Sequence, residues 1–505
     1  VGVLIGSRSL FSFRSALMPI NRFLRCLLPA TLVVTAYSLS SQADEYERPD
    51  FAHETSDLKS DERVVYGELS NGLRYAVMEN DTPAGTASMR LRIAVGSLDE
   101  AEDELGIAHY LEHMAFNGSK NIPEGEMIKR LERIGLSFGA DTNAHTSFDE
   151  TVYKLNLPNV DDEVVDEAFM LMRETASNLT LAQDAIDRER GIIRSEKRTR
   201  NSAAYQRTVA EWEFFTRGSG LTDRMPIGTD EAIDSMQANQ FRAFYDTHYH
   251  PEKAMFVFVG DLPVDRVIAK IEATFGDWEG VNEPTPIATL PGAEMRPGDV
   301  GYYYDPEVMT STAIAVLRPY TDRPDGRATR RMRLVNFVAM QMLSDRLIKL
   351  SHEPDSIIVS SSVSHQSLFE TAYVSRLTVR SEPEDWEAAL AIGEQELRRA
   401  LQFGFAQSEL DLQIVDLRRR YEAAAKEAGT PRTHGSRGSG MVDRIIGAYE
   451  NERVLEDPRD TLERFEEDIA TVTLEEVQTA FGEAWTGSET PMIYLNSPKR
   501  GLHFL

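Results

Sequence analysis

The order of strand-like and helix-like segments limits the fold most, because the same kind of series runs twice along the chain. Alternating or continuous apolar runs predict strands, and long amphipathic stretches predict helices. The first series has strands expected at 64–68, 73–78, 87–95, 137–146, 150–157 and 253–259, and helices at 105–117, 124–134, 162–178, 182–206, 230–246 and 264–275. The second has strands expected at 311–318, 356–364, 369–379 and 491–495, and helices at 327–350, 384–403, 407–427 and 457–482. The sequence therefore predicts an α+β fold with two mixed domains.

Prolines and glycines mark the boundary between the two series. Residues 280–300 contain four prolines and three glycines, which interrupt both helices and strands. We therefore expect a first domain at 63–280, a linker at 281–300 and a second domain at 301–505. The polar residues 44–62 predict another linker in front of the first domain. A chain of 505 residues is long enough for two domains, each with its own core.

The first 43 residues have the parts of a secretory signal. Met18 is a better start than Val1, because arginines follow it, then an apolar run at 27–39, then small residues at 41–43. The alternative is a membrane-spanning helix, but the run is shorter than the roughly 20 residues that a span requires. We therefore expect cleavage near Asp44, a periplasmic or secreted protein, and no stable membrane anchor.

The composition excludes several classes of function. Acidic residues outnumber basic ones 82 to 54, for a net charge of −28. Residues 1–43 carry four arginines and no acidic residue, so the chain without them has a net charge of −32. Nucleic-acid binding needs clustered lysines and arginines, and is not expected. The single cysteine, Cys26, excludes a disulfide framework, so any metal must be bound by His, Asp or Glu.

The residues most informative about function form the run His109-Tyr110-Leu111-Glu112-His113. On a helix, residues four apart lie on one face, so His109 and His113 can bind one metal ion through their imidazole nitrogens. Glu112 lies at the edge of that face, where it can reach a water molecule on the metal without binding the metal itself. This is the inverse order of the His-Glu-x-x-His motif of zinc peptidases. Two surface histidines beside a glutamate are the alternative interpretation.

A third ligand is expected from the helix predicted at 182–206. Glu189 and Glu196 lie seven residues apart on it, which places them within ~20° of the same helix face, two turns from one another. One of them can bind the metal while the other supports the site. The spacing alone does not say which one binds.

These motifs together resemble the pitrilysin/insulinase family of zinc peptidases. The resemblance rests on residues 109–120, on Glu189 to Glu196, on the hairpin at 69–73 and on the segments 143–153 and 249–261. It implies one zinc ion per chain, bound by His109, His113 and Glu196. It also implies that Glu112 is the general base and that Glu189 is the supporting acid.

The resemblance further implies a fold and a mode of substrate binding. The fold would be two homologous mixed α/β-sandwich domains of the pitrilysin and mitochondrial-processing-peptidase type, forming half of a clamshell. Peptide would add to an edge strand at Asn143 and Ala144. His145 stands where the family usually has an aromatic residue. It is also a candidate fourth ligand, but a fourth protein ligand would occupy the position that the water needs.

The sequence therefore predicts a zinc metalloendopeptidase for short or unfolded polypeptides, similar to the N-terminal half of the long periplasmic members in Gram-negative bacteria. A second pitrilysin-type half is the expected partner, supplied by a longer chain, another subunit or a homodimer. The second domain is expected to be non-catalytic. The alternative function is a non-catalytic or structural subunit of such an assembly. The pair His248 and His250 is expected to have a structural role.

Overall fold

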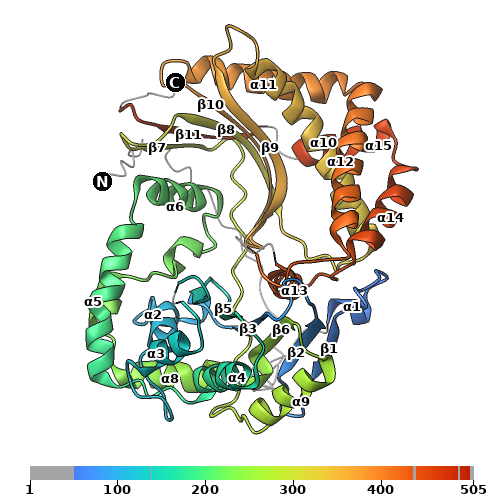
Figure 1. Ribbon diagram of the computed structural model, residues 1–505. Helices are drawn as coiled ribbons and strands as arrows, with labels where there is room; N and C mark the ends of the chain where they lie inside the picture. Colours follow the sequence, from blue (N-terminus) through green and yellow to red (C-terminus); the bar gives the residue numbers. More distant parts are fainter. Residues whose placement is uncertain (1–50, 138, 436–439, 487–489, 501–505) are drawn as a thin grey trace, which may run out of the picture. The chain divides into compact units, whose positions relative to one another are not determined.

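The computed structural model describes residues 51–137, 139–435, 440–486 and 490–500 (Figure 1). The expected signal segment, 1–43, lies outside the described residues. All described residues fall within one compact unit. Among them, no helix combines the length and the apolar character needed to cross a lipid bilayer.

The first part of the chain forms a six-stranded mixed sheet. Its strands are β1 (Val65–Glu68), β2 (Arg74–Glu79), β3 (Ala87–Ile93), β4 (Thr142–Thr146), β5 (Thr151–Leu157) and β6 (Ala254–Gly260). They lie in the order β1-β2-β6-β3-β5-β4. Only β2 and β6 pair in parallel, and the other neighbours are antiparallel. The order leaves β4 at one edge of the sheet.

Both faces of this sheet are covered, which explains why β3 and β6 are buried at every residue. The helices of this part are α1 (Ala52–Thr55), α2 (Ile107–Met114), α3 (Glu126–Arg133), α4 (Asp162–Ser177), α5 (Gln183–Arg200), α6 (Ala203–Phe215), α7 (Asp230–Ser235), α8 (Ala238–His248) and α9 (Val264–Phe275). Apolar residues of α2, α4, α8 and α9 share one core with β3, β5 and β6. On the other face, a smaller core joins β2 and β6 to the later helix α13 (Met441–Glu450).

The second sheet repeats the topology of the first. Its strands are β7 (Val300–Tyr304), β8 (Ser311–Pro319), β9 (Ile358–Leu368), β10 (Ala372–Ser381) and β11 (Met492–Ser497), in the order β7-β11-β8-β10-β9. This order matches β2-β6-β3-β5-β4, and β7 and β11 are the one parallel pair, as β2 and β6 are in the first sheet. Strand β9 therefore stands where β4 stands in the first sheet.

Helices cover one face of the second sheet. They are α10 (Arg327–Ser351), α11 (Trp386–Phe403), α12 (Gln407–Glu427), α14 (Pro458–Ile469) and α15 (Leu474–Trp485), and Figure 1 shows them together on one side of β8 to β10. Apolar residues of all five form one core with β8, β9 and β10. Aromatic residues of α6 pack near the other face, where Phe214 lies 4.9 Å from Tyr494 between ring centroids.

The structure corrects several predicted elements. The helix predicted at 182–206 is two helices, because Ser202 caps α6 by accepting a hydrogen bond from the Tyr205 backbone N–H. The helix predicted at 457–482 is also two, with Thr473 capping α15 in the same way. Helix α13 and strand β7 were not predicted. Both are short, and β7 begins at the end of the segment interpreted as a linker.

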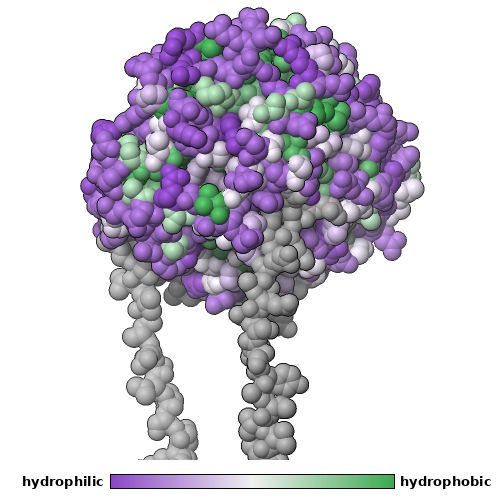
Figure 2. Space-filling model, turned by 90° about the horizontal axis from the view of Figure 1, so that it is seen from below, coloured by the Kyte–Doolittle hydropathy of each residue, from purple (hydrophilic) through white to green (hydrophobic). Residues whose placement is uncertain are grey.

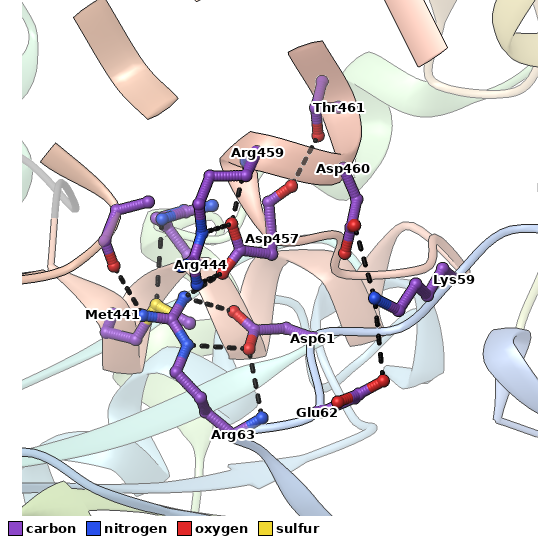
Figure 3. A network of polar contacts seen from close by, with 11 residues as sticks. Lys59, Asp61, Glu62, Arg63, Met441, Arg444, Asp457, Arg459, Asp460 and Thr461 are labelled. Atoms are coloured by element: carbon purple, nitrogen blue, oxygen red, sulfur yellow. Dashed lines mark hydrogen bonds and ion pairs between the residues drawn. The ribbon is translucent and has the colours of Figure 1, made fainter. Parts of the chain in front are cut away.

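The segment interpreted as a linker in front of the first sheet is packed against the second series. Asp61 is buried, its backbone N–H donates to the Leu455 carbonyl over 2.7 Å, and its carboxylate pairs with Arg63 at 2.6 Å. Arg63 also pairs with Asp457, the residue that caps α14, at 3.1 Å. Figure 3 shows these groups converging from residues 59–63 and from α13 and α14. Ion pairs therefore join the start of one series to the end of the other.

Candidate metal centre

The helix that carries the histidine motif is fixed at its N-terminus. The buried carboxylate of Glu100 accepts hydrogen bonds from the backbone N–H groups of Gly106 and Ala108, over 2.8 and 3.0 Å. Gly106 has a φ of +100°, and a Cβ there would lie 2.9 Å from the Cα of Gly228. Glycine is therefore required where α2 begins. A carboxylate at this end also interacts favourably with the helix dipole.

Helix α5 is held by polar contacts with α2 and with the end of α7. The Tyr110 hydroxyl of α2 donates to the Ile186 carbonyl of α5. Arg190 of α5 donates to the Ile233 and Met236 carbonyls at the end of α7. These contacts fix which face of α5 is turned toward the two histidines.

Three side chains, His109, His113 and Glu196, converge on one point between these helices. The Glu196 Oε2 atom lies 3.2 Å from His113 Nε2 and 3.7 Å from His109 Nε2. Donor atoms that bind one zinc ion tetrahedrally, with bonds of about 2.0–2.1 Å, lie about 3.3–3.4 Å apart. The two distances lie on either side of that value. Across the described ranges, this is the one group of three or more His, Cys, Asp or Glu side chains placed to hold a metal ion.

The protonation and hydrogen bonding of the histidines fit a cation at this point. Within the described part of the chain, both ring nitrogens of buried His109 lack a hydrogen-bond partner. Burying polar atoms without a partner is costly unless a metal ion or another group binds them. Burial opposes a positive charge on His113, yet hydrogen bonds to Glu189 and Glu196 outweigh it and raise the pKa of His113 to about 9. The contacts with His109 and His113 hold the pKa of Glu196 well below its usual range.

Glu189 binds the far side of the same imidazole. Its Oε1 lies 2.8 Å from His113 Nδ1, and its Oε2 accepts a hydrogen bond from Asn117 Nδ2 over 3.1 Å. Metal-binding histidines commonly donate their second ring N–H to a carboxylate, which fixes the tautomer and the ring orientation. Glu189 is placed for that supporting role and Glu196 for metal binding, which is the division that the family resemblance implies.

The Glu112 carboxylate lies close enough to His113 to interact with it electrostatically, and it also contacts strand β4. The Thr146 hydroxyl at the end of β4 donates to Glu112 Oε2 over 2.7 Å. Glu112 is buried, so this contact fixes the carboxylate beside the metal position. A carboxylate placed in this way can accept a proton from a water molecule bound at the metal.

Of the other residues singled out in the sequence, Asn143, Ala144 and His145 lie on β4, while His248 and His250 lie at and after the end of α8. Asn143 is exposed, and its Oδ1 accepts a hydrogen bond from the Ala144 N–H over 2.9 Å, on the free edge of the sheet. His145 is not in the metal-binding group, and its Nε2 contacts Glu150 at 3.3 Å. His248 contacts Thr285 and His250 contacts the Asp246 carbonyl, each over 3.3 Å.

Sequence reasoning did not assign roles to Thr146, Asn117, Glu100 or Arg200. Thr146 and Asn117 belong to segments that carried the family resemblance, but nothing in their spacing links them to Glu112 or Glu189. Glu100 lies six residues before Gly106, the N-cap of α2, and meets the helix through a loop. The i,i+4 spacing of Glu196 and Arg200 was the one available signal, and these two side chains do form an ion pair, with 2.5 Å between Oε1 and Nη2.

Comparisons with known proteins identify the family of this chain. The sequence profile "Insulinase (Peptidase family M16)" matches residues 75–212, and "Peptidase M16 inactive domain" matches residues 235–414. The chain belongs to the insulinase family of peptidases. The pitrilysin/insulinase resemblance seen in the sequence is therefore confirmed.

Within the insulinase family, the chain is similar to a protein of Escherichia coli, "Probable zinc protease PqqL". The two are 36% identical over 215 residues, which are 43% of this chain and 23% of that protein. The solved structure of the periplasmic protease PqqL from E. coli has a TM-score of 0.80 at 24% identity and covers 88% of this chain and 48% of its own. The structure of the first half of that protease has a TM-score of 0.79, with 93% of it covered. The predicted α+β fold of half a clamshell is confirmed, and the chain spans about half the length of the solved relative.

Proposed function

We propose that this chain is the active half of a zinc metalloendopeptidase that cleaves short or unfolded polypeptides. The observation that carries the proposal is the convergence of His109, His113 and Glu196 at distances suited to one zinc ion, with Glu112 beside them. Its relatives are named zinc proteases, which supports the metal and the class of reaction. Zinc bound by these three ligands would polarise the scissile carbonyl and lower the pKa of a bound water molecule.

The side chains of this protein would move the proton. The Glu112 carboxylate accepts a proton from the attacking water and donates it to the leaving amine as the peptide bond breaks. The Thr146 hydroxyl, 2.7 Å from Glu112 Oε2, holds one oxygen of the base and leaves the other for this exchange. Glu189 keeps the His113 ring in the tautomer that presents Nε2 to the metal.

The substrate would bind as an added strand along β4. This strand ends the sheet, so one row of its backbone N–H and C=O groups is not used by the ladder. The Ala144 N–H is among them, because Asn143 Oδ1 rather than a neighbouring strand accepts its hydrogen bond. A peptide would displace the Asn143 side chain and pair with this edge through main-chain hydrogen bonds, so selection by sequence would be broad.

The same proposal assigns roles to the two domains, and it includes a second half and a location for the protein. The first domain, 63–280, would be catalytic and the second, 301–505, a scaffold. The match to half of a solved periplasmic protease supports a second pitrilysin-type half in the functional assembly. It also supports the periplasmic or secreted location that the first 43 residues predict.

The first experiment measures metal content and peptide cleavage together. The purified chain should hold one zinc ion and cleave unstructured peptides slowly without its second half, with activity lost on chelation and restored by zinc. Glu112→Gln should keep the zinc and lower kcat by at least about 10²-fold, because it removes the base but no metal ligand. A metal-free wild-type chain that cleaves nothing, alone or with a second half, would favour the alternative of a non-catalytic subunit.

A further inference from the structure

We propose that Arg200 is a positioning residue that keeps Glu196 bound to the metal through one oxygen only. The inference rests on the proposed zinc site and goes beyond its set of ligands. It starts from the two Glu196 oxygens, which have different partners. Oε2 faces the two imidazoles, at 3.2 and 3.7 Å, while Oε1 is paired with Arg200 Nη2 at 2.5 Å.

The position of Arg200 on α5 makes this contact specific. Arg200 is the last residue of α5 and stands one turn after Glu196, so its guanidinium reaches back along the same helix face. The side chain of Glu196 is 26% exposed and that of Arg200 is 53% exposed. The guanidinium therefore approaches the carboxylate from the solvent side, and the imidazoles approach it from the interior.

The stability of α5 alone does not account for the ion pair between Glu196 and Arg200. An exposed i,i+4 ion pair contributes little to the stability of a helix. The ion pair has a larger effect on geometry, because the guanidinium attracts one carboxylate oxygen, which sets the rotation of the carboxylate and occupies that oxygen. In this arrangement Oε1 is unavailable to a metal ion bound at Oε2.

The consequence concerns the open position that catalysis requires. Catalytic zinc sites use three protein ligands and leave the fourth position to water or substrate. A glutamate that binds through both oxygens adds a further ligand and crowds that position. By holding Oε1, Arg200 would keep the protein at three donor atoms, which are His109 Nε2, His113 Nε2 and Glu196 Oε2.

The test compares Arg200→Met with wild type as zinc-loaded full chains, using X-ray absorption fine structure at the zinc edge. Methionine keeps much of the length of the side chain and removes the donor. We expect the variant to retain one zinc ion while the number of light-atom neighbours rises from four to five. The cobalt-substituted variant should show the weaker visible bands of a five-coordinate ion. Arg200→Lys, which keeps a charged donor, should stay close to the wild-type spectrum.

Arg194→Met is the matched control. Arg194 lies on the same helix, is 46% exposed and pairs with Asp234 at 2.8 Å instead of with Glu196, so its variant should keep the wild-type spectrum. An unchanged coordination number in Arg200→Met would overturn the inference. Loss of zinc from that variant would also overturn it, because a glutamate bound through two oxygens should hold zinc at least as well. A wild-type chain that binds no zinc would instead overturn the proposed function and this inference together.

Discussion

At the residue scale, three side chains of the metal centre, His113, Glu112 and Glu196, each have a partner that fixes one atom. Glu189 holds the Nδ1 side of His113, Thr146 holds one oxygen of Glu112, and Arg200 holds one oxygen of Glu196. Donor atoms held in this way lose little conformational entropy when a metal ion binds, so the site is preorganised. His109 has no such partner, and both of its nitrogens are buried without a hydrogen bond.

The two glutamates of α5 should separate metal binding from support. Glu196→Gln should strip most of the zinc at micromolar metal, because it removes a charged ligand. Glu189→Gln should keep the zinc but weaken its affinity by about 10–100-fold, the usual cost of losing a partner behind a ligand. Zinc titration against a competing chelator checks both variants. The reverse order of affinities would show that the roles of the two acids are exchanged.

At the element scale, a strand and two helices from separate parts of the sequence build the site. Helix α2 brings the motif, α5 brings the glutamates, and β4 brings the contact to the base and the free edge for the substrate. Each element was predicted from its periodicity, although α5 ends at Arg200 and not at residue 206. Arg200 is the last residue of α5 and stands one turn after Glu196, with which it forms an ion pair.

A proline on the free edge should test strand addition. Ala144→Pro removes an N–H that no other strand uses, so the sheet should tolerate it. We expect KM for unstructured peptides to rise about tenfold, the effect of one lost main-chain hydrogen bond, with zinc content unchanged. Asn143→Pro is the contrasting variant, because its N–H faces β5 in the ladder and its loss should destabilise the fold. An unchanged KM in Ala144→Pro would contradict binding along this edge.

At the scale of the whole molecule, α13 of the second series closes the open face of the first sheet. Its buried residues Met441, Val442 and Ile445 pack on β6 and its neighbours. At the end of α13, the Glu450 carboxyl is hydrogen-bonded to the Glu150 carboxylate, which also accepts from Arg92 Nε over 2.8 Å. An acid pair therefore lies where the two series meet.

This acid pair should make stability depend on pH. Burial and the hydrogen bond to Glu150 raise the pKa of Glu450 to about 8. For Glu150, burial would raise the pKa, but contacts with His145, Glu450 and Arg92 outweigh burial and hold the pKa below its usual range. The folded chain keeps a proton on Glu450 that the unfolded chain releases near pH 4.5. The contribution of Glu450 to the free energy of unfolding is therefore complete below pH 4.5 and is lost as the pH rises to about 8.

Glu450→Gln should remove this dependence, because glutamine donates a hydrogen bond at every pH. Between pH 5 and pH 8.5, wild type should lose on the order of 1–3 kcal/mol of unfolding free energy that the variant keeps. Urea unfolding at several pH values measures the difference, with the exposed Glu463→Gln as the control. If the free energy of unfolding depends on pH in the same way in wild type and Glu450→Gln, the folded chain does not hold a proton between Glu450 and Glu150. Arg92, His145, Asp149 and Lys154 also face the pair and are unchanged in this comparison.

The negative charge of the molecule should favour basic substrates. Without residues 1–43 the chain has a net charge of −32, and Figure 2 shows a face on which hydrophilic residues surround small groups of apolar ones. Long-range attraction raises the rate at which cationic peptides arrive, and salt screens it. We expect kcat/KM for a lysine-rich peptide to exceed that for a matched acidic peptide about tenfold at low salt. Equal values at every salt concentration would mean that the charge serves solubility alone.

The sequence by itself determined the features that depend on local order. The spacing of His109, Glu112 and His113 on one helix, and of Glu189 and Glu196 on another, fixes which residues can share a face. Apolar periodicity located most strands and helices, and the prolines and glycines at 280–300 predict a break between the two series. These signals are local, because hydrogen bonds within a helix and the alternation along a strand act over a few residues.

Only the tertiary structure decided which helix faces meet and which atoms within them are partners. His113 and Glu196 are 83 positions apart in the sequence, yet His113 Nε2 lies 3.2 Å from Glu196 Oε2. Whether Glu189 or Glu196 faces the metal position depends on the rotation of α5 about its axis relative to α2. The position of β4 at the sheet edge follows from the strand order. Helix α13 packs on the first sheet because the apolar face of that sheet would otherwise be exposed. These features depend on packing between segments that are distant in the sequence. Such packing leaves no periodic pattern in the sequence, because the residues in contact have no regular spacing along the chain.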